Sequence, residues 1–346
     1  MAINRRALLR SGFTVTAVGA LGATASFSTA AADPRAVARP TMHNCAAWNA
    51  RPANGAITVL NRKPAYIVVH HTAGGNSNDF SLAHAFSISR GIQNHHMDTN
   101  GWIDSGQQLT NSRGGHITEG RHRSLEILDQ GTRHVQGAHV GNHNSETIGI
   151  ENEGLYTSVN VTPQLWDSLV RLVAYIAQQY DIDPSMIRGH RDFNATQCPG
   201  NVLYSRLPEL RSAVGAVLGV AVVEPKTWPL LEPGASGAQV LAAQHLLRSR
   251  GETGLAADGS FGQSTFDATA KFAKASGVAY EPCYASRVAD ESGFVGSSTW
   301  PLLVQPVRVG DRSEAAEAAR VLLDARGEAA PADREIDLST WQELLS

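Results

Sequence analysis

The apolar positions in the first two thirds of the chain predict alternating strands and helices. The run at residues 66–69 (Tyr-Ile-Val-Val) is short and β-branched, as in a strand that is buried on both faces. Residues 147–150 (Thr-Ile-Gly-Ile) form a second candidate strand, and residues 107–110 (Gln-Gln-Leu-Thr) a weaker third. The clearest helix follows the cap Thr162 and a first-turn proline, because apolar residues then recur on one face as far as Tyr180. These elements predict an α/β fold with a mixed central sheet flanked by helices, and with site residues at strand ends and in loops.

The last third of the chain contains a repeat. Residues 234–251 and 310–327 each run from glycine to glycine with apolar positions at helical spacing, and the closing glycine suits a helix C-terminus. A Thr-Trp-Pro-Leu-Leu segment stands ahead of each copy, at residues 227–231 and 299–303. A change of composition near residue 221 separates this region from the rest. The sequence therefore predicts small, all-α helical-bundle repeats at the C-terminal end.

The N-terminal segment is typical of an export signal. Arg5 and Arg6 precede an apolar, Gly/Ala-rich stretch at residues 15–25 and a run of small residues that ends at Ala32. This pattern predicts a twin-arginine signal over residues 1–32. The apolar stretch is short for a membrane span, and no later segment offers about 20 apolar residues. We expect a protein that is secreted or located in the cell wall, without a membrane span.

Composition sets broad limits on the partners and the redox chemistry. The chain of 346 residues is 42% hydrophobic and 18% charged with a formal net charge of -3, and removal of the signal leaves room for two or more domains. No basic cluster could follow a phosphate backbone, so nucleic acid is not an expected partner. Three cysteines are too few for a disulfide framework. If Cys198 binds a metal, Cys45 and Cys283 either form a bridge or remain buried free thiols.

Three residues offer metal-binding chemistry. His70 follows the first apolar run, and His190 and Cys198 lie together in residues 189–200. Two imidazoles and a thiolate suit Zn²⁺, and three protein ligands leave the fourth tetrahedral position for water, as in catalytic zinc sites. A single histidine is more often a core or solvated side chain. We interpret the remaining candidates in that way, namely His71, His116, His122, His134, His143 and His245.

Seven short segments between residues 45 and 210 support this interpretation because they follow one another in the order of a known family. They are residues 48–52, 67–73, 96–106, 119–121, 137–139, 145–151 and 189–200. In these segments the chain resembles the zinc-dependent amidases of type 2, which include N-acetylmuramoyl-L-alanine amidases, phage amidases and peptidoglycan recognition proteins. The resemblance implies the amidase fold over residues 33–220, one Zn²⁺ held by His70, His190 and Cys198, and peptidoglycan as the partner.

The C-terminal region resembles the small helical peptidoglycan-binding domain. Residues 221–304 carry its first helix, the Asp-Gly-Ser-Phe-Gly turn that begins at Asp258, a helix with Phe272, and Trp300. Residues 305–346 lack that turn, so they are expected to be a degenerate or truncated second repeat. We expect most of the Trp and Phe side chains to pack in the core, and wall binding rests on the resemblance alone.

The family pattern also suggests the catalytic groups. Many members have a tyrosine where this chain has Gln107, which cannot serve as a base. Glu151 matches the carboxylate that another branch uses as general base and acid, and Glu153 is the alternative on the same face of an extended strand. Thr196 stands where the family has a Lys or Thr that supports the oxyanion.

The resemblance further assigns His139, Arg121, His96 and Trp102 to substrate binding. The expected function is cleavage of the amide between the lactyl group of N-acetylmuramic acid and L-alanine of the stem peptide, by attack of zinc-bound water with Glu151 as base and acid. Two alternatives stay open at this point. One is a non-catalytic peptidoglycan recognition protein, and the other is a hydrolase with Cys198 as its nucleophile.

Overall fold

The computed structural model describes residues 36–278, 290–329 and 331–346. The predicted export signal and Cys283 lie outside these residues. Cys45, the other candidate for a disulfide, is buried, and its thiol donates a hydrogen bond to the carbonyl oxygen of Gly120 at 3.5 Å.

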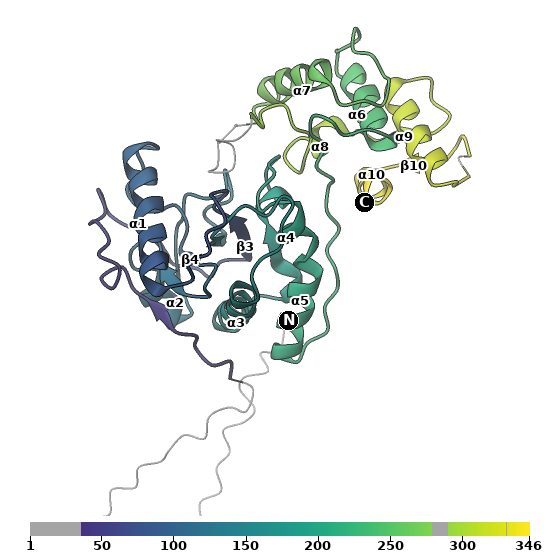
Figure 1. Cartoon of the computed structure of the whole chain (residues 1–346). Coiled ribbons are helices and arrows are strands. Elements are labelled where there is room, and N and C mark those ends of the chain that lie inside the picture. Colours follow the sequence, from purple (N-terminus) through teal and green to yellow (C-terminus); the bar gives the residue numbers. More distant parts are fainter. Residues whose placement is uncertain (1–35, 279–289, 330) are drawn as a thin grey trace, which may run out of the picture. The chain divides into compact units, whose positions relative to one another are not determined.

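A six-stranded mixed sheet forms the centre of the N-terminal part (Figure 1). Its strands, in spatial order, are β1 (Met42–His43), β5 (Ile117–Glu119), β4 (Leu109–Asn111), β7 (Thr147–Asn152), β3 (Tyr66–His71) and β8 (Ile187–Gly189). Strands β4, β7, β3 and β8 run parallel, whereas β4 and β5 are antiparallel. A separate two-stranded sheet joins β2 (Val59–Leu60) to β6 (His134–Val135). The predicted α/β class is confirmed, with β3 and β7 at the two expected runs, while the weaker third strand begins only at Leu109.

Helices cover both faces of this sheet (Figure 1). On one face, α1 (Leu82–Asp98) contacts β5, where the hydroxyl oxygens of Ser89 and Thr118 lie 2.7 Å apart. On the other face, α3 (Pro163–Tyr180) and α5 (Leu207–Leu218) pack on each other and share a hydrophobic core with Ile117. Successive residues of a strand point to opposite faces, so Ile117 points to the layer of α3 and α5 and Thr118 points to the layer of α1. The short helices α2 (Ser124–Gln130) and α4 (Asn201–Ser205) complete this part.

The predicted helix at residues 162–180 is confirmed. The Thr162 hydroxyl oxygen accepts a hydrogen bond from the backbone N–H of Leu165 at 3.2 Å, and Pro163 occupies the first turn, where it needs no hydrogen-bond donor. The helix ends at Tyr180, because the next residue, Asp181, takes a left-handed conformation with φ 61°.

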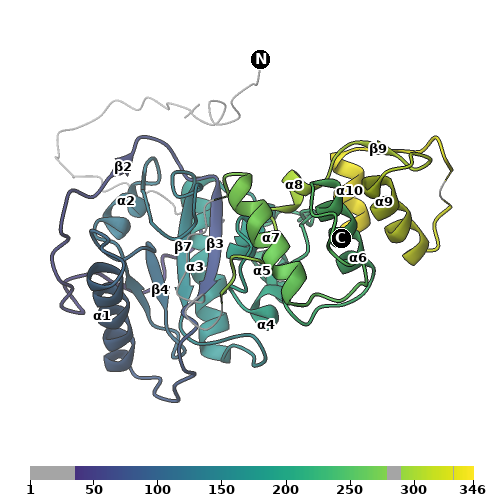
Figure 2. The same cartoon turned by 90° about the horizontal axis from the view of Figure 1, so that it is seen from above.

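The two faces of β3 and β7 carry different kinds of side chain. Val69 and Ile150 point into the core that contains α3 and α5. The next residue on each strand, His70 and Glu151, therefore points to the opposite face. These two residues are partners in the parallel register of β3 and β7, which lie side by side in Figure 2. The alternation of the strands thus sets a histidine and a carboxylate next to each other where both strands end.

The C-terminal part has a hydrophobic core of its own. Its elements are α6 (Ala238–Ser249), α7 (Gln263–Ala275), α8 (Trp300–Leu303), α9 (Glu314–Ala325), α10 (Leu338–Leu345) and the antiparallel pair β9 (Val307–Arg308) and β10 (Glu335–Ile336). The repeated helices α6 and α9 pack on each other, so the two predicted repeats share one core. Phe261, Trp300 and Trp341 are buried in it, which confirms their expected packing role.

The glycines that close the two repeats lie just beyond the helix ends, as the sequence predicts. Gly251 follows α6 with φ 107°, and Gly327 follows α9 with φ 65°. Such left-handed angles end a helix at no steric cost only when the residue is glycine.

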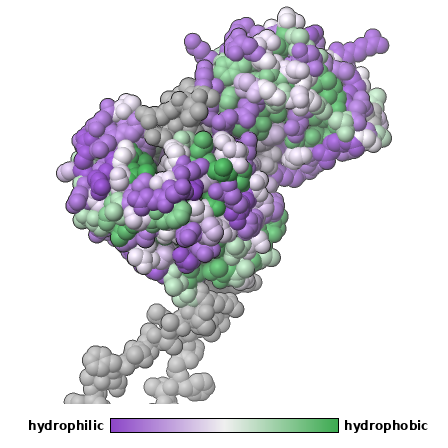
Figure 3. Space-filling model, viewed as in Figure 1, coloured by the Kyte–Doolittle hydropathy of each residue, from purple (hydrophilic) through white to green (hydrophobic). Residues whose placement is uncertain are grey.

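The face of the molecule drawn in Figure 3 is mixed in polarity. In the view of Figure 3, hydrophilic residues cover much of the visible face, with smaller hydrophobic areas among them. Within residues 36–278, 290–329 and 331–346, none of the helices combines the length and the apolar character that a membrane span requires.

Candidate active site

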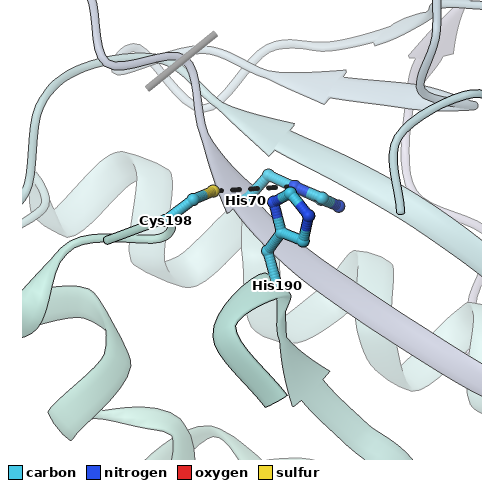
Figure 4. Close-up of side chains that lie close together, drawn as sticks. All are labelled: His70, His190 and Cys198. Atoms are coloured by element: carbon cyan, nitrogen blue, oxygen red, sulfur yellow. Dashed lines mark hydrogen bonds between the residues drawn. The ribbon is translucent and has the colours of Figure 1, made fainter. Parts of the chain in front are cut away.

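Three buried side chains converge beside the end of β3 (Figure 4). His70 is the fifth residue of β3, and His190 begins the 3-10 helix η3 (His190–Asp192) directly after the neighbouring strand β8. Cys198 follows in the next loop and points toward both imidazoles (Figure 4). One ligand atom from each residue lies within 4.8 Å of the other two.

Hydrogen bonds orient the two imidazoles in the same sense. His70 Nε2 lies 3.0 Å from His139 Nδ1, and His190 Nε2 lies 3.1 Å from Asn194 Oδ1. The Nδ1 atom of each imidazole therefore takes no part in these two hydrogen bonds and remains available to the centre of the cluster. His70 Nδ1 is 3.6 Å from Cys198 Sγ, and His190 Nδ1 is buried and has no hydrogen-bond partner among the residues that the structure describes.

The residues present fit a zinc ion. In a tetrahedral centre with Zn–S and Zn–N distances of about 2.3 Å and 2.0 Å, neighbouring N and S ligands lie about 3.5 Å apart. The distance between His70 Nδ1 and Cys198 Sγ, 3.6 Å, is close to this value. Burial, together with the nearby imidazoles of His190 and His139, holds the pKa of His70 well below its usual value. A neutral ring keeps the lone pair that a metal ligand must supply.

Glu151 brings a carboxylate to this cluster. Its Oε1 atom lies 4.0 Å from His70 Nδ1, and its side chain is 12% exposed. Glu153, the alternative proton acceptor, is used elsewhere: its carboxylate accepts from the backbone N–H of Arg113 at 2.9 Å and contacts His84 Nε2 at 2.8 Å. The geometry therefore favours Glu151 over Glu153 as the group that can act at the cluster.

Gln107 stands where the resemblance described above leads us to expect a tyrosine. Its side-chain amide donates a hydrogen bond to the Thr110 hydroxyl oxygen at 2.9 Å, and Thr110 pairs in register with Glu151. Gln107 thus contacts the strand next to the carboxylate but offers no group that could accept a proton at neutral pH.

Thr196 lies in the loop that carries Cys198. The side chain is buried, and its hydroxyl oxygen accepts a hydrogen bond from the backbone N–H of Cys198 at 3.2 Å. The Thr196 hydroxyl group is therefore fixed against the backbone of Cys198, one of the candidate ligands.

The four residues expected to bind substrate make contacts inside the protein. The Arg121 guanidinium donates to the carbonyl oxygens of Ser105 at 2.7 Å and of Gln136 at 2.9 Å. His96 Nδ1 accepts from the backbone N–H of Gly106 at 3.0 Å. The rings of Trp102 and His96 have centroids 4.7 Å apart, and His139 contacts His70. Substrate binding by these four residues stays a prediction.

Sequence reasoning did not find the partners that orient the two histidines. The sequence assigns His139 to substrate binding and gives no role to Asn194, although Asn194 follows His190 by four residues and can contact it across one helical turn. The core interpretation of His71 is confirmed, since it is buried and its Nδ1 accepts from the backbone N–H of Tyr156 at 3.3 Å.

The part of the chain that carries this cluster matches a known family. Residues 60–201, which include all the candidate ligands together with Glu151 and Thr196, match the family model described as N-acetylmuramoyl-L-alanine amidase. Peptidoglycan-recognition protein SC2 of Drosophila melanogaster is 29% identical over 174 residues, which make up 50% of this chain and 88% of the relative. The N-acetylmuramoyl-L-alanine amidase of Homo sapiens is 28% identical over 174 residues, and the match covers 49% of this chain but 28% of that protein.

Solved structures with similarity to this chain carry the same two kinds of name. The Drosophila peptidoglycan recognition protein SD is 26% identical, with a TM-score of 0.43, and the match covers 49% of this chain and 95% of that one. The N-acetylmuramoyl-L-alanine amidase LysC from Clostridium intestinale URNW is 25% identical, with a TM-score of 0.40, over 53% of this chain and 100% of that one. The relatives thus include proteins named as amidases and proteins named for recognition.

Proposed function

Because residues 60–201 form a domain of the N-acetylmuramoyl-L-alanine amidase family, we propose that this protein is an exported zinc hydrolase of peptidoglycan. It cleaves the amide bond between the lactyl group of N-acetylmuramic acid and L-alanine of the stem peptide. The observation that carries the proposal is the convergence of His70, His190 and Cys198, whose ligand atoms lie within 4.8 Å of one another. The identity of the bond rests on the family.

The donor set indicates which chemistry the metal supplies. Two imidazoles and one thiolate hold Zn²⁺ and leave one tetrahedral position open. Zinc in such a site lowers the pKa of a water molecule from about 15.7 to about 7 and polarises a carbonyl oxygen. His70 would offer Nδ1 to the metal because its Nε2 is held by His139, and His190 would offer Nδ1 because its Nε2 is held by Asn194.

Glu151 moves the proton. Its Oε1 atom lies 4.0 Å from His70 Nδ1, so the carboxylate stands beside the cluster at which a reacting water molecule would be bound. Acting as a base, Glu151 takes a proton from that water; acting as an acid, it gives the proton to the nitrogen of the leaving L-alanine. The side chain is 12% exposed, so bulk water competes little for the carboxylate.

Thr196 supports the negative charge that develops on the scissile carbonyl oxygen. Its hydroxyl can donate one hydrogen bond to that oxygen, while its lone pair remains bonded to the backbone N–H of Cys198. A donor of this kind stabilises the transition state more than the ground state, which is the condition for a faster chemical step.

The location and the wall contact are part of the same proposal. The paired Arg5 and Arg6 and the small residues up to Ala32 direct export, and the signal is removed from the mature protein. The first C-terminal unit, with helices α6, α7 and α8, keeps the enzyme on its substrate, a role that rests on the resemblance of residues 221–304 to peptidoglycan-binding domains.

Digestion of purified muropeptides by the mature protein tests the proposal. Mass spectrometry should detect free stem peptides that begin at L-alanine, and their release should stop with a chelator and return with added Zn²⁺. Elemental analysis should find one zinc per chain. If the muropeptides stay intact under every metal condition, the hydrolase proposal is wrong.

One observation favours a second function, recognition without cleavage. Gln107 donates its amide hydrogen to Thr110 and leaves the site without the tyrosine of many amidases. A recognition protein would bind muropeptides in the same experiment and release no stem peptide.

A hydrolase with Cys198 as nucleophile would be active in the metal-free form, so activity that survives complete removal of zinc would favour that mechanism.

A further inference from the structure

The ring of His139 lies in a space that two glycines leave open. A Cβ atom added at Gly149 would come within 2.6 Å of His139 Nδ1 and Cε1, and one added at Gly137 would come within 2.4 Å of His139 Cδ2. Real Cβ atoms essentially never approach so closely. Neither glycine has a positive φ angle, so the backbone does not require glycine at either position. The His139 ring accounts for the glycine at Gly149, and at Gly137 the ring acts together with the carbonyl oxygen of Gly106, which an added Cβ would approach to 2.9 Å.

The ring in this space is bonded at both nitrogens. His139 Nδ1 lies 3.0 Å from His70 Nε2, with the two rings nearly perpendicular at 84°. His139 Nε2 lies 3.4 Å from the Thr147 hydroxyl oxygen, and that hydroxyl donates to the carbonyl oxygen of His143 at 2.9 Å. These contacts form a continuous chain from the backbone at His143 to the candidate ligand His70.

The direction of this chain determines which nitrogen of His70 carries the hydrogen. The carbonyl oxygen of His143 can only accept, so the Thr147 hydroxyl donates to it and accepts from His139 Nε2. A neutral imidazole has one donor and one acceptor, so His139 Nδ1 is an acceptor. His70 Nε2 is then the donor in the next bond, and His70 Nδ1 keeps its lone pair.

That lone pair faces the centre of the cluster. His70 Nδ1 is 3.6 Å from Cys198 Sγ and 4.0 Å from Glu151 Oε1. We propose that His139 is a positioning residue: through His70 Nε2 it fixes the tautomer and the ring orientation in which His70 Nδ1 binds zinc. Gly137 and Gly149 serve the same purpose by leaving room for the ring. This inference rests on the proposed zinc hydrolase and concerns a residue that the sequence assigns to substrate binding.

The test compares zinc affinity in variants of the full mature chain, measured by competition with a chromophoric chelator. His139→Leu fills much of the space but removes the acceptor, and it should weaken zinc binding by about 10- to 100-fold, the usual effect of losing an outer partner of a histidine ligand. His139→Asn can place a carbonyl oxygen near the position of Nδ1, and it should keep the affinity within a few-fold of the original.

Gly149→Ala supplies a second perturbation that leaves His139 in the chain. The added methyl group displaces the ring, so zinc affinity should fall as in His139→Leu. Gly91→Ala in α1 is the matched control, because a Cβ at that position meets no atom within 4 Å. It should leave zinc affinity unchanged.

A second readout does not depend on metal binding. In the metal-free chain, nitrogen-15 NMR of the imidazoles should find His70 as the Nε2–H tautomer, and His139→Leu should convert it to a mixture of tautomers. The inference is overturned if His139→Leu binds zinc as tightly as the original chain, or if His70 is the Nδ1–H tautomer. A chain that binds no zinc at all would overturn the proposed function as well, so the two failures can be distinguished.

Discussion

Replacement of Glu151 by glutamine removes the proposed proton acceptor and keeps the volume of the side chain. The carboxylate lies 4.0 Å from His70 Nδ1 at the end of β7. General acid–base catalysis by one positioned group contributes about 10²- to 10⁴-fold in rate, or about 3 to 5 kcal/mol of activation free energy. Because the side chain is only 12% exposed, buffer bases have little access to replace it. We therefore expect kcat to fall by about 10³-fold or more, within that range.

The assay is the rate of stem-peptide release from a defined muropeptide, followed by chromatography at saturating substrate. Zinc content is measured on the same samples. The Glu151→Gln protein should keep one zinc per chain, since the three ligands are unchanged. Glu126→Gln is the matched control, because its carboxylate lies on α2 with 54% of the side chain exposed. The control should retain full activity.

Two results would refute this account of Glu151. If Glu151→Gln keeps its zinc and cleaves within a few-fold of the original rate, then the proton is accepted elsewhere. If the variant loses zinc together with activity, then Glu151 holds the metal site together and is not primarily a base.

Three further predictions concern the oxyanion, the metal and pH. Thr196→Val should lower kcat by about 10²- to 10³-fold while Thr196→Ser retains most of the activity, and equal loss in both variants would contradict a hydrogen bond from the hydroxyl. In a sample whose free Zn²⁺ concentration is about 100 to 1,000 times the Kd, removal of the metal should lower the free energy of unfolding by about 3 to 4 kcal/mol. Calorimetry should then find a Tm that is lower by roughly 5 to 16 °C, and an unchanged Tm would argue against a bound ion. The hydrogen bond to Asp104 raises the pKa of His122 above 6.5, so this pair stabilises the fold fully below pH 6.5, and the stabilisation is lost as pH rises through the raised pKa. Denaturant unfolding should therefore find a larger penalty for His122→Asn at pH 5.5 than at pH 9, and a penalty that grows with pH would show that the sign is wrong.

Local pattern was sufficient to predict the elements that carry the site. Strands β3 and β7 and helix α3 have β-branched runs, caps and apolar periodicity that depend on neighbours in sequence. The start of β4 was placed two residues early, because Gln107 and Gln108 fit the strand pattern but precede the paired residues. The pair β9 and β10 was not predicted, since each strand has only two residues.

The roles of single polar residues were harder to predict where they depend on distant contacts. His139 lies 69 residues from His70 in sequence, and only the folded sheet brings the rings together. Glu151 and Glu153 are expected on the same face of an extended strand, yet Glu153 pairs with His84 of α1, 69 residues away in sequence. A histidine or glutamate in the sequence indicates possible chemistry, and its partners are decided by tertiary structure.

The register of the sheet links the stability of the fold to the geometry of the site. Val69 and Ile150 are fully buried, and His70 and Glu151 follow them directly on paired strands. A shift of either strand by one residue would move an apolar side chain to the site face and a polar side chain into the hydrophobic core, so the core holds the register strongly. The same alternation makes Gly149 the neighbour of Glu151 on the site face, where it leaves room for the ring that orients His70. The core thus positions a metal ligand, a proton acceptor and the space behind the ligand together, and a substitution that loosens β7 should disturb all three.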